Sequence, residues 1–362
     1  MYLKKGYLMK KIAIIGIVGV PACYGGFESL VENLLNYTPP DVEYIVFCSK
    51  KRYDKELPSY KGAKLKYINL DANGKSSMLY DFLCMMQSLK SDAMVLLGNS
   101  GSWSLPFIRK IYKGKIITNV DGIEWERDKW SKKTKKIIRH LVNQSVKYSD
   151  VLIGDNKGIT DFLLTNYNKK AELIAYGGDQ ATIIKNDSLF ITYPFCKEKY
   201  AISVCRIEPE NNIHIILEAF SLQNKIQLLF IGNWENSEYG KNLKKIYSEY
   251  SHLHLLNPIY DTDIINWLRC NATLYIHGHS AGGTNPSLVE AMNLRLPVLA
   301  YDCVYNRATT ENKALYWKDK EDIINQLNID QVQCTEIAAE MYAIAEREYT
   351  WKRIAEKYNS LY

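Results

Sequence analysis

No stretch of the 362-residue sequence holds about eighteen or more consecutive apolar residues, so no segment is long enough to cross a bilayer as a helix. The eight cysteines are widely spaced and include no C-x-x-C pair, which argues against a zinc or disulfide framework and favours reduced thiols in a cytosolic protein. A net charge of only +6 is too small and too scattered to predict a nucleic-acid partner, although it fits an anionic substrate or an anionic membrane surface.

The common signatures of nucleotide cofactors are missing too. Gly16 and Gly19 lie three positions apart, so the first glycine loop does not read G-x-G-x-x-G, and no G-K-[ST] sequence supplies a P-loop lysine. No D-x-D pair is placed to hold a metal, and His277 and His279 fit packed or hydrogen-bonded core positions better than a zinc site. We therefore expect a protein without a resident cofactor or metal.

What the sequence does contain is an alternation of short, β-branched apolar runs with longer segments of helical periodicity. This pattern predicts an α/β fold with two Rossmann-like, doubly wound domains. We place the first domain at residues 9–185, the second at 186–335, and a last helix at 336–362 that crosses back onto the first domain. Ligands of open α/β sheets bind outside the carboxyl ends of the strands, so two such domains facing each other predict a cleft between them.

The most informative segment covers residues 277–292, reading H-G-H-S-A-G-G-T-N-P-S-L-V-E-A-M. It predicts the end of a buried strand, a tight loop at Gly282-Gly283-Thr284-Asn285, and a helix that starts at Pro286. A helix start presents unpaired N–H groups to an anion, so a phosphate binds there readily. Glu290 lies about one turn into the helix and can accept hydrogen bonds from sugar hydroxyls. The alternative is a plain strand-to-helix turn with glycine for geometry.

A second glycine-rich loop follows the first predicted strand. Its four glycines, Gly16, Gly19, Gly25 and Gly26, leave backbone N–H groups free for an anion or a sugar.

Five segments, in order along the chain, carry a family resemblance. They read G-I-V-G-V-P-A-C-Y-G-G-F-E-S-L-V-E-N-L (16–34), N-V-D-G-I-E-W-E-R-D-K-W (119–130), A-Y-G-G-D (175–179), C-R-I-E-P-E-N-N (205–212) and H-S-A-G-G-T-N-P-S-L-V-E-A-M (279–292). Together they resemble the rhamnosyltransferase-like branch of the retaining GT-B glycosyltransferases of family four.

The resemblance implies a role for several residues of a donor site. Gly25 and Gly26 match a loop that lies against the donor diphosphate and the reacting sugar. Arg206 matches an arginine that clamps the diphosphate, for which its planar fork is suited. Glu290 matches the second of two paired glutamates, the one that holds the nucleotide ribose.

Two departures from the family pattern concern the same site. The first glutamate of the pair would fall at Gly282, and the lysine that usually follows the arginine is Asn211. The donor-sugar hydroxyl that this glutamate normally binds must therefore be held by another group, and one phosphate charge clamp is missing. Glu210 and His279 are further candidates for this site.

On the acceptor side, the resemblance points to Asp121, which could orient or deprotonate the acceptor hydroxyl. The alternative is a helix cap for a segment beginning near Ile123. Glu124 is a weaker candidate in the same segment.

A basic stretch with tryptophans at its head, residues 125–140, can rest on an anionic membrane surface. A solvated helix face is the alternative interpretation.

The resemblance thus implies a cytoplasmic, peripheral membrane enzyme. It would transfer L-rhamnose from a dTDP donor to a saccharide on a polyprenyl diphosphate, during bacterial surface-polysaccharide assembly. A UDP-sugar-dependent galactosyl-, glucosyl- or N-acetylhexosaminyltransferase is the first alternative. A GT-B-like sugar-nucleotide epimerase and a non-catalytic nucleotide-sugar-binding protein are the others. Linkage and oligomeric state stay open.

Overall fold

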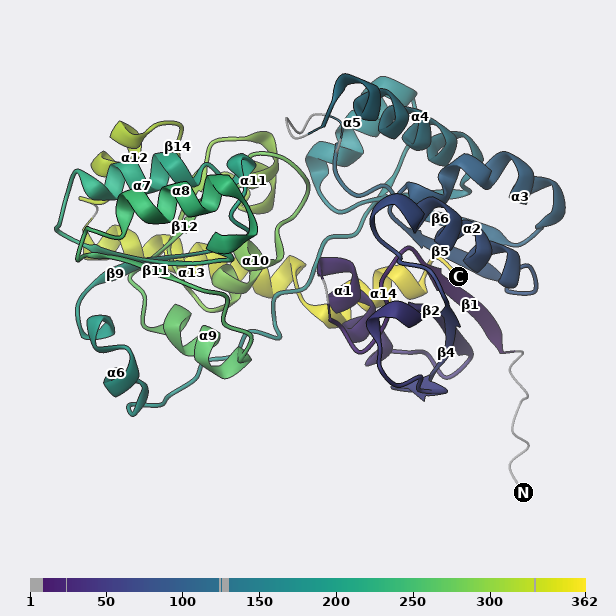
Figure 1. Cartoon of the computed structure of the whole chain (residues 1–362), viewed down its shortest axis with the longest axis horizontal. Helices are drawn as coiled ribbons and strands as arrows, with labels where there is room; N and C mark the ends of the chain where they lie inside the picture. Colours follow the sequence, from purple (N-terminus) through teal and green to yellow (C-terminus); the bar gives the residue numbers. More distant parts are fainter. Residues whose placement is uncertain (1–8, 24, 124, 126–129, 329) are drawn as a thin grey trace. The chain divides into compact units, whose positions relative to one another are not determined.

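The computed structural model describes residues 9–23, 25–123, 125, 130–328 and 330–362. The chain divides into two compact units (Figure 1). The first contains the residues up to 175 together with 351–362, and the second contains residues 176–350.

The first unit is built on an eight-stranded sheet with the order β3-β4-β2-β1-β5-β6-β7-β8, in which only the β3–β4 pair is antiparallel. Residues 12–15 of β1 are fully buried, as expected of a parallel strand covered by helices on both faces. The strands are β1 (Lys10–Ile15), β2 (Val42–Ser49), β3 (Ser59–Tyr60), β4 (Ala63–Ile68), β5 (Ala93–Leu97), β6 (Lys115–Asn119), β7 (Val151–Gly154) and β8 (Glu172–Leu173). The helices are α1 (Gly26–Leu35), α2 (Ser77–Gln87), α3 (Leu105–Ile111), α4 (Lys132–Tyr148), α5 (Lys157–Tyr167) and α14 (Trp351–Asn359).

The second unit has a six-stranded parallel sheet with the order β11-β10-β9-β12-β13-β14. Its strands are β9 (Tyr200–Val204), β10 (Gln227–Ile231), β11 (Leu253–Leu256), β12 (Leu274–His277), β13 (Val298–Tyr301) and β14 (Leu315–Trp317). Its helices are α6 (Leu189–Thr192), α7 (Ile213–Ser221), α8 (Glu238–Tyr247), α9 (Thr262–Cys270), α10 (Pro286–Asn293), α11 (Val304–Thr309), α12 (Lys320–Gln326) and α13 (Gln331–Glu348). The prediction of two doubly wound α/β domains is confirmed.

Each sheet has one point at which the strand order reverses: between β1 and β5 in the first unit, and between β9 and β12 in the second. Crevices at the carboxyl ends of such strand pairs are where α/β proteins bind ligands. The chain places residues 16–19 and 98–99 at one of these points, and residues 205–206 and 278–279 at the other.

The end of the chain differs from the single helix expected at 336–362. The structure has two helices there, α13 and α14, and only α14 belongs to the first unit. The break lies at Tyr349, whose carbonyl accepts from the Gly178 N–H at 2.8 Å and whose hydroxyl donates to the Thr309 carbonyl at 2.9 Å. Both bonds hold the end of α13 in the second unit. In the described part of the chain, no helix combines the length and the apolar character that a membrane crossing needs.

Candidate functional site

In the second unit, the loops that follow β9 and β12 are joined by hydrogen bonds. The Ser280 N–H donates to the Glu210 carbonyl at 3.0 Å, and the Asn212 side chain donates to the Gly278 carbonyl at 2.9 Å. A Cβ on Gly278 would lie 2.0 Å from the Asn211 carbonyl oxygen, so only glycine permits this approach. The two predicted donor-site segments therefore form one surface.

Asn211, the residue at the position of the expected lysine, is a buried bridge in this surface. Its Nδ2 donates to the Arg206 carbonyl at 2.7 Å, and its Oδ1 accepts from His279 Nδ1 at 2.7 Å. His279 is also buried. Sequence reasoning noted Asn211 only as a missing charge. The structure shows that its amide fixes the backbone of Arg206 against the β12 loop.

The Arg206 guanidinium itself extends into solvent. Its side chain is 66% exposed, and its ion pair with Glu208 is long at 4.0 Å. A fixed backbone with an exposed planar cation is suited to an anionic ligand with two oxygens, because both guanidinium edges can donate.

The loop before α10 has the predicted geometry. Gly282 has a φ of 118°, which a residue with a side chain rarely adopts, whereas Thr284 is buried and Gly283 is partly exposed. Asn285 is the N-cap of α10, and its side chain accepts from the Ser287 N–H at 3.0 Å.

Glu290 lies one turn into α10 and is engaged at both carboxylate oxygens. Its Oε2 pairs with an Arg269 guanidinium nitrogen at 2.6 Å, and its Oε1 accepts from Gln180 Nε2 at 2.7 Å. The Glu290 side chain is 19% exposed, whereas the Arg269 side chain is 4% exposed. Sequence reasoning missed both partners.

In the first unit, the glycine loop is organised by Glu28. Its carboxylate accepts from the Val18 N–H at 2.7 Å and from the Gly25 N–H at 2.9 Å. The expectation that the Gly25 N–H is free for a ligand is therefore wrong, because Glu28 occupies it. Gly26 is the first residue of α1, with Gly25 as N-cap.

Asp121 follows β6 in a left-handed backbone conformation, with a φ of 59°. Its N–H donates to Asn119 Oδ1 at 3.0 Å, and the Val120 carbonyl accepts from Asn99 Nδ2 at 2.7 Å. Most of the segment that Asp121 could cap, beginning near Ile123, lies outside the described residues. The structure thus gives Asp121 a fixed backbone, and both its acceptor role and the capping role stay predictions. Glu124 lies outside the described residues.

Residues 132–140 of the basic stretch form the first half of α4, whereas residues 126–129 lie outside the described residues. Trp125, which we expected at the exposed head of this stretch, is only 6% exposed. Its ring packs against Phe162 at 5.6 Å between centroids, and the Arg139 guanidinium lies 5.7 Å from its ring centroid. This tryptophan is therefore part of the packing between α4 and α5.

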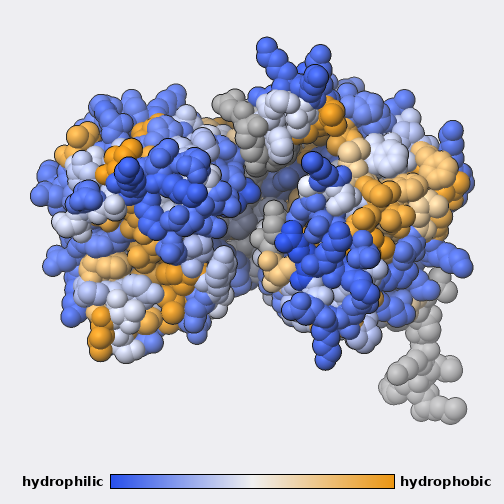
Figure 2. All heavy atoms as spheres, viewed as in Figure 1, coloured by the Kyte–Doolittle hydropathy of each residue, from blue (hydrophilic) through white to orange (hydrophobic). Residues whose placement is uncertain are grey.

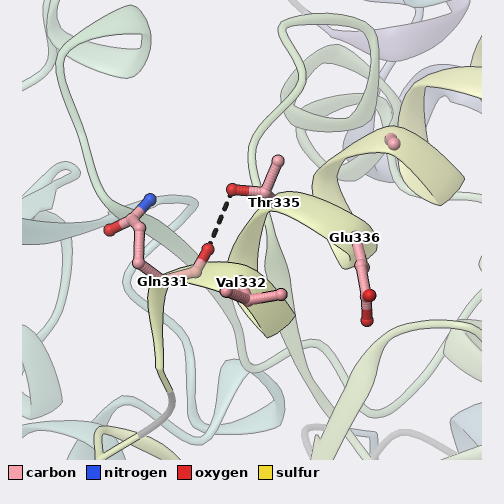
Figure 3. Close-up of a pocket in the computed structure, with 5 residues that line it drawn as sticks. Gln331, Val332, Thr335 and Glu336 are labelled. Carbon is pink, nitrogen blue, oxygen red and sulfur yellow. Dashed lines mark hydrogen bonds between the residues drawn. The ribbon is translucent and has the colours of Figure 1, made fainter.

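Other candidate features have structural explanations. The D-x-D sequence Asp261-Thr262-Asp263 belongs to the start of α9, where Asp261 caps the helix. Within the described residues, no group of three or more His, Cys, Asp or Glu side chains gathers as a metal site. A surface hollow of about 400 Å³ is lined by residues of α13. Figure 3 shows that the Thr335 hydroxyl in this hollow donates a hydrogen bond to the Gln331 carbonyl. None of the predicted site residues lines it.

Comparison with known families separates the same two parts of the chain. Residues 9–179 match a family model described as a domain of unknown function. Residues 188–330 match the model of the glycosyl transferases group 1. No curated protein matches the sequence.

Several solved structures share the fold at low identity. Sucrose-phosphate synthase from Thermosynechococcus elongatus has a TM-score of 0.81 at 14% identity, with 98% of each chain covered. Anabaena HepE in complex with UDP and glucose has a TM-score of 0.74 at 14% identity, covering 98% of this chain and 99% of that one. An E. coli structure titled trehalose-6-phosphate, bound with UDP-2-fluoro glucose, has a TM-score of 0.70 at 13% identity, covering 97% and 98%. The chain thus has the GT-B fold of these structures, and residues 188–330 of its second unit match the glycosyl transferases group 1 model.

Proposed function

We propose that this protein is a retaining glycosyltransferase. It transfers L-rhamnose from dTDP-L-rhamnose to a saccharide carried on a polyprenyl diphosphate, in the assembly of a bacterial surface polysaccharide. The observation that carries the proposal lies within the group 1 domain, where the exposed Arg206 guanidinium stands on a backbone that Asn211 ties to the β12 loop. The α10 start and Glu290 follow that loop.

These parts match the demands of breaking a bond to a nucleoside diphosphate. The leaving group departs with two or more negative charges, which Arg206 and the N-terminus of α10 stabilise electrostatically. Glu290 holds the ribose hydroxyls. Retention at the sugar carbon does not require the paired carboxylates of a glycoside hydrolase, and the reaction needs no metal in this proposal.

The first unit contributes the acceptor side. Asp121 orients the acceptor hydroxyl or takes its proton as the new glycosidic bond forms. Its left-handed backbone, fixed through Asn119 and Asn99, supports a defined direction for its carboxylate.

A second candidate donor class is favoured by the structural neighbours. HepE is described with UDP and glucose, and the E. coli structure with UDP-2-fluoro glucose. A UDP-sugar-dependent hexosyltransferase with the same fold is therefore the alternative.

A donor panel tests the proposal. The purified chain is mixed with dTDP-L-rhamnose and with UDP-linked glucose, galactose and N-acetylhexosamines, and both thermal protection and release of free sugar are measured. We expect dTDP-L-rhamnose to raise the melting temperature most and to be hydrolysed slowly when acceptor is absent. Preference for a UDP sugar would move the assignment to the alternative, and indifference to every donor would refute both.

Substitution of Asp121 tests the acceptor role. Asp121→Asn keeps the size of the side chain but removes its charge and its ability to accept a proton. We expect donor binding and melting temperature to persist while transfer to the lipid-linked acceptor falls steeply. An Asn variant that transfers at the parent rate would remove Asp121 from the site.

The acceptor's lipid also implies contact with an anionic membrane surface, at the cytoplasmic face. Helix α4 has no acidic residue, and it packs against α3 and the short helical segment 100–104. Figure 2 shows hydrophobic side chains gathered over α2 and α3. Trp103, just before α3, and Phe107, on α3, are 41% and 49% exposed, and both rings pack against Phe82 of α2. Apolar insertion beside basic residues is how peripheral proteins bind such membranes.

Vesicle sedimentation tests this contact. We expect binding to phosphatidylglycerol vesicles and little binding to phosphatidylcholine vesicles. The double variant Lys132→Glu, Lys136→Glu should weaken vesicle binding because it reverses two charges that face the anionic lipid. The double variant Trp103→Ser, Phe107→Ser should weaken binding because the apolar side chains no longer insert into the membrane. Equal binding of all variants would contradict this role for the surface.

A further inference from the structure

The surroundings of Glu290 contain a buried cation that the proposed function does not use. Arg269, on α9, is 4% exposed on its side chain and pairs with Glu290 at 2.6 Å. Within the described part of the chain, its Nε has no hydrogen-bond partner. A buried guanidinium is tolerated when an anion compensates its charge, and Glu290 is the residue placed to do so.

The second oxygen of Glu290 is held from another direction. Gln180 donates to it at 2.7 Å, from a segment that lies directly on the backbone of α10. A Cβ on Gly178 would stand 2.5 Å from the Val289 carbonyl oxygen and 3.0 Å from the Glu290 nitrogen. This close approach brings Gln180 to the open side of the helix, where its side chain is exposed.

The two contacts leave part of the carboxylate open to a ligand. A carboxylate has about four acceptor positions, and Arg269 and Gln180 use one on each oxygen. Because the oxygens are held by groups on different elements, the carboxylate is fixed in one orientation before any ligand arrives. The Glu290 side chain remains 19% exposed, so a hydroxyl can reach the open positions.

The pairing also changes the charge that a donor meets. A nucleoside diphosphate is an anion, and an unpaired glutamate near the start of α10 would repel it and offset the favourable helix dipole. The Arg269 guanidinium cancels that charge while leaving the hydrogen-bond acceptors in place.

We propose that Arg269, with Gln180, is a positioning residue of the donor site. It holds the Glu290 carboxylate so that the open acceptor positions receive the ribose 3′-hydroxyl, and it neutralises the carboxylate toward the diphosphate. This inference rests on the proposed function, since it takes Glu290 to be the ribose ligand.

The test uses a pair of ligands that differ only in that hydroxyl. Calorimetry gives the affinities of the parent chain for dTDP and 3′-deoxy-dTDP, or for the uridine pair if UDP binds more tightly. The variants are Arg269→Met, which keeps an unbranched apolar chain but removes the guanidinium, Arg269→Lys, and Gln180→Ala. Lys320→Met is the matched control, because it removes a cation on α12 that pairs with Glu218 of α7, away from Glu290 in the sequence.

We expect the parent to prefer the 3′-hydroxyl ligand by about tenfold or more, as for a hydrogen bond to a charged group. In Arg269→Met this preference should fall to near one, and the affinity for both ligands should drop. The preferences of Gln180→Ala and Arg269→Lys for the 3′-hydroxyl ligand should lie between those of the parent and Arg269→Met. The control variant should show the preference of the parent.

Weaker binding of both ligands with the preference intact would mean that Arg269 only supports the fold, and would overturn the proposal. If Arg269→Met does not fold, the exposed Gln180→Ala decides, and an unchanged preference there overturns the proposal equally. A parent that binds either nucleotide without discriminating the 3′-hydroxyl sinks the role of Arg269 and leaves the glycosyltransferase assignment standing. A parent that binds neither nucleotide sinks both.

Discussion

Glu28 in the first unit and Glu290 in the second occupy similar places in the sequence. Each lies in the first two turns of a helix that follows a parallel strand and a glycine loop. Their partners differ: Glu28 accepts from two backbone N–H groups of its own loop, whereas Glu290 is held by two side chains from other elements. Glu28 is 4% exposed, and the Glu290 side chain is 19% exposed.

The difference separates a carboxylate that builds a loop from one that is presented to a ligand. The Glu28 carboxylate closes the glycine loop on itself and is sealed from solvent. Glu290 is fixed from behind and keeps an open side. The same residue type after the same kind of loop therefore supports the fold in one unit and, in our proposal, binds the donor in the other.

The largest effect we expect comes from removing the loop-building carboxylate. Glu28→Ala leaves the Val18 and Gly25 N–H groups without their acceptor, and should lower the free energy of unfolding of the first unit by about 2–5 kcal/mol. Hydrogen exchange followed by mass spectrometry measures this in peptides of β1 and α1, with β12 peptides as the internal reference. Asp161→Ala, which breaks an exposed pair with Lys157, should change little. A Glu28 variant as stable as its control would mean that the loop does not depend on this carboxylate.

In the second unit, the exposed Arg206 provides the opposite case, a residue whose loss affects activity and spares stability. Arg206→Ala should lower the turnover number by about ten- to a thousandfold through the lost charge-assisted contact to the leaving diphosphate. The melting temperature should hold, because the side chain is 66% exposed. Steady-state kinetics beside thermal unfolding measures both, with Lys241→Ala as a surface control. Turnover within twofold of the parent would exclude Arg206 from the diphosphate site.

Much of this fold can be predicted because buried parallel strands leave a continuous apolar signal. Residues 12–15 and 228–231 are apolar without alternation, and both segments are buried strands. The glycine loop before α10 is equally visible, since Gly282 does adopt the positive φ that its position implies.

The sequence does not predict contacts between residues that lie far apart along the chain, because no fixed spacing links such residues. Arg269 and Gln180 reach Glu290 from α9 and from the segment before α6, and neither position carries a pattern that points to the carboxylate. The burial of Trp125 depends on Phe162 of α5 in the same way. The break at Tyr349 has no glycine or proline to announce it, because it results from bonds to Gly178 and Thr309.

The two units also differ in the ionisable groups they bury, and this predicts opposite responses to pH. His277 is buried in the second unit, and burial lowers its pKa to about 3. The imidazole stays neutral in the folded protein. The stability that this group contributes is therefore fully present above pH 6.5, its pKa in the unfolded chain. It falls below that pH, because the unfolded state then binds a proton that the folded state does not. Between pH 7 and pH 5, the second unit should lose about 2 kcal/mol through this group.

Hydrogen exchange of β12 peptides, corrected for intrinsic rates, measures this loss in the parent and in His277→Phe. The variant cannot titrate at this position, so its stability should fall less with acid. Parallel profiles for the two proteins would show that His277 is not the titrating group.

The smallest effect concerns Asp81 in the first unit and has the opposite sign. Burial raises the pKa of this carboxyl to about 7, against the lowering effect of hydrogen bonds from Ser100 and the Gly101 backbone. The protonated carboxyl is therefore favoured in the folded protein. The stability that it contributes is fully present below pH 3.8, the pKa of the carboxyl in the unfolded chain, and it is lost as the pH rises through 7. From pH 6 to pH 8 the first unit should lose about 1 kcal/mol. Asp81→Asn, which imitates the protonated carboxyl, should flatten this fall in β1 peptides and leave β12 peptides unchanged. If β1 keeps its pH dependence in the Asn variant, Asp81 is ionised in the fold and the contrast with His277 fails.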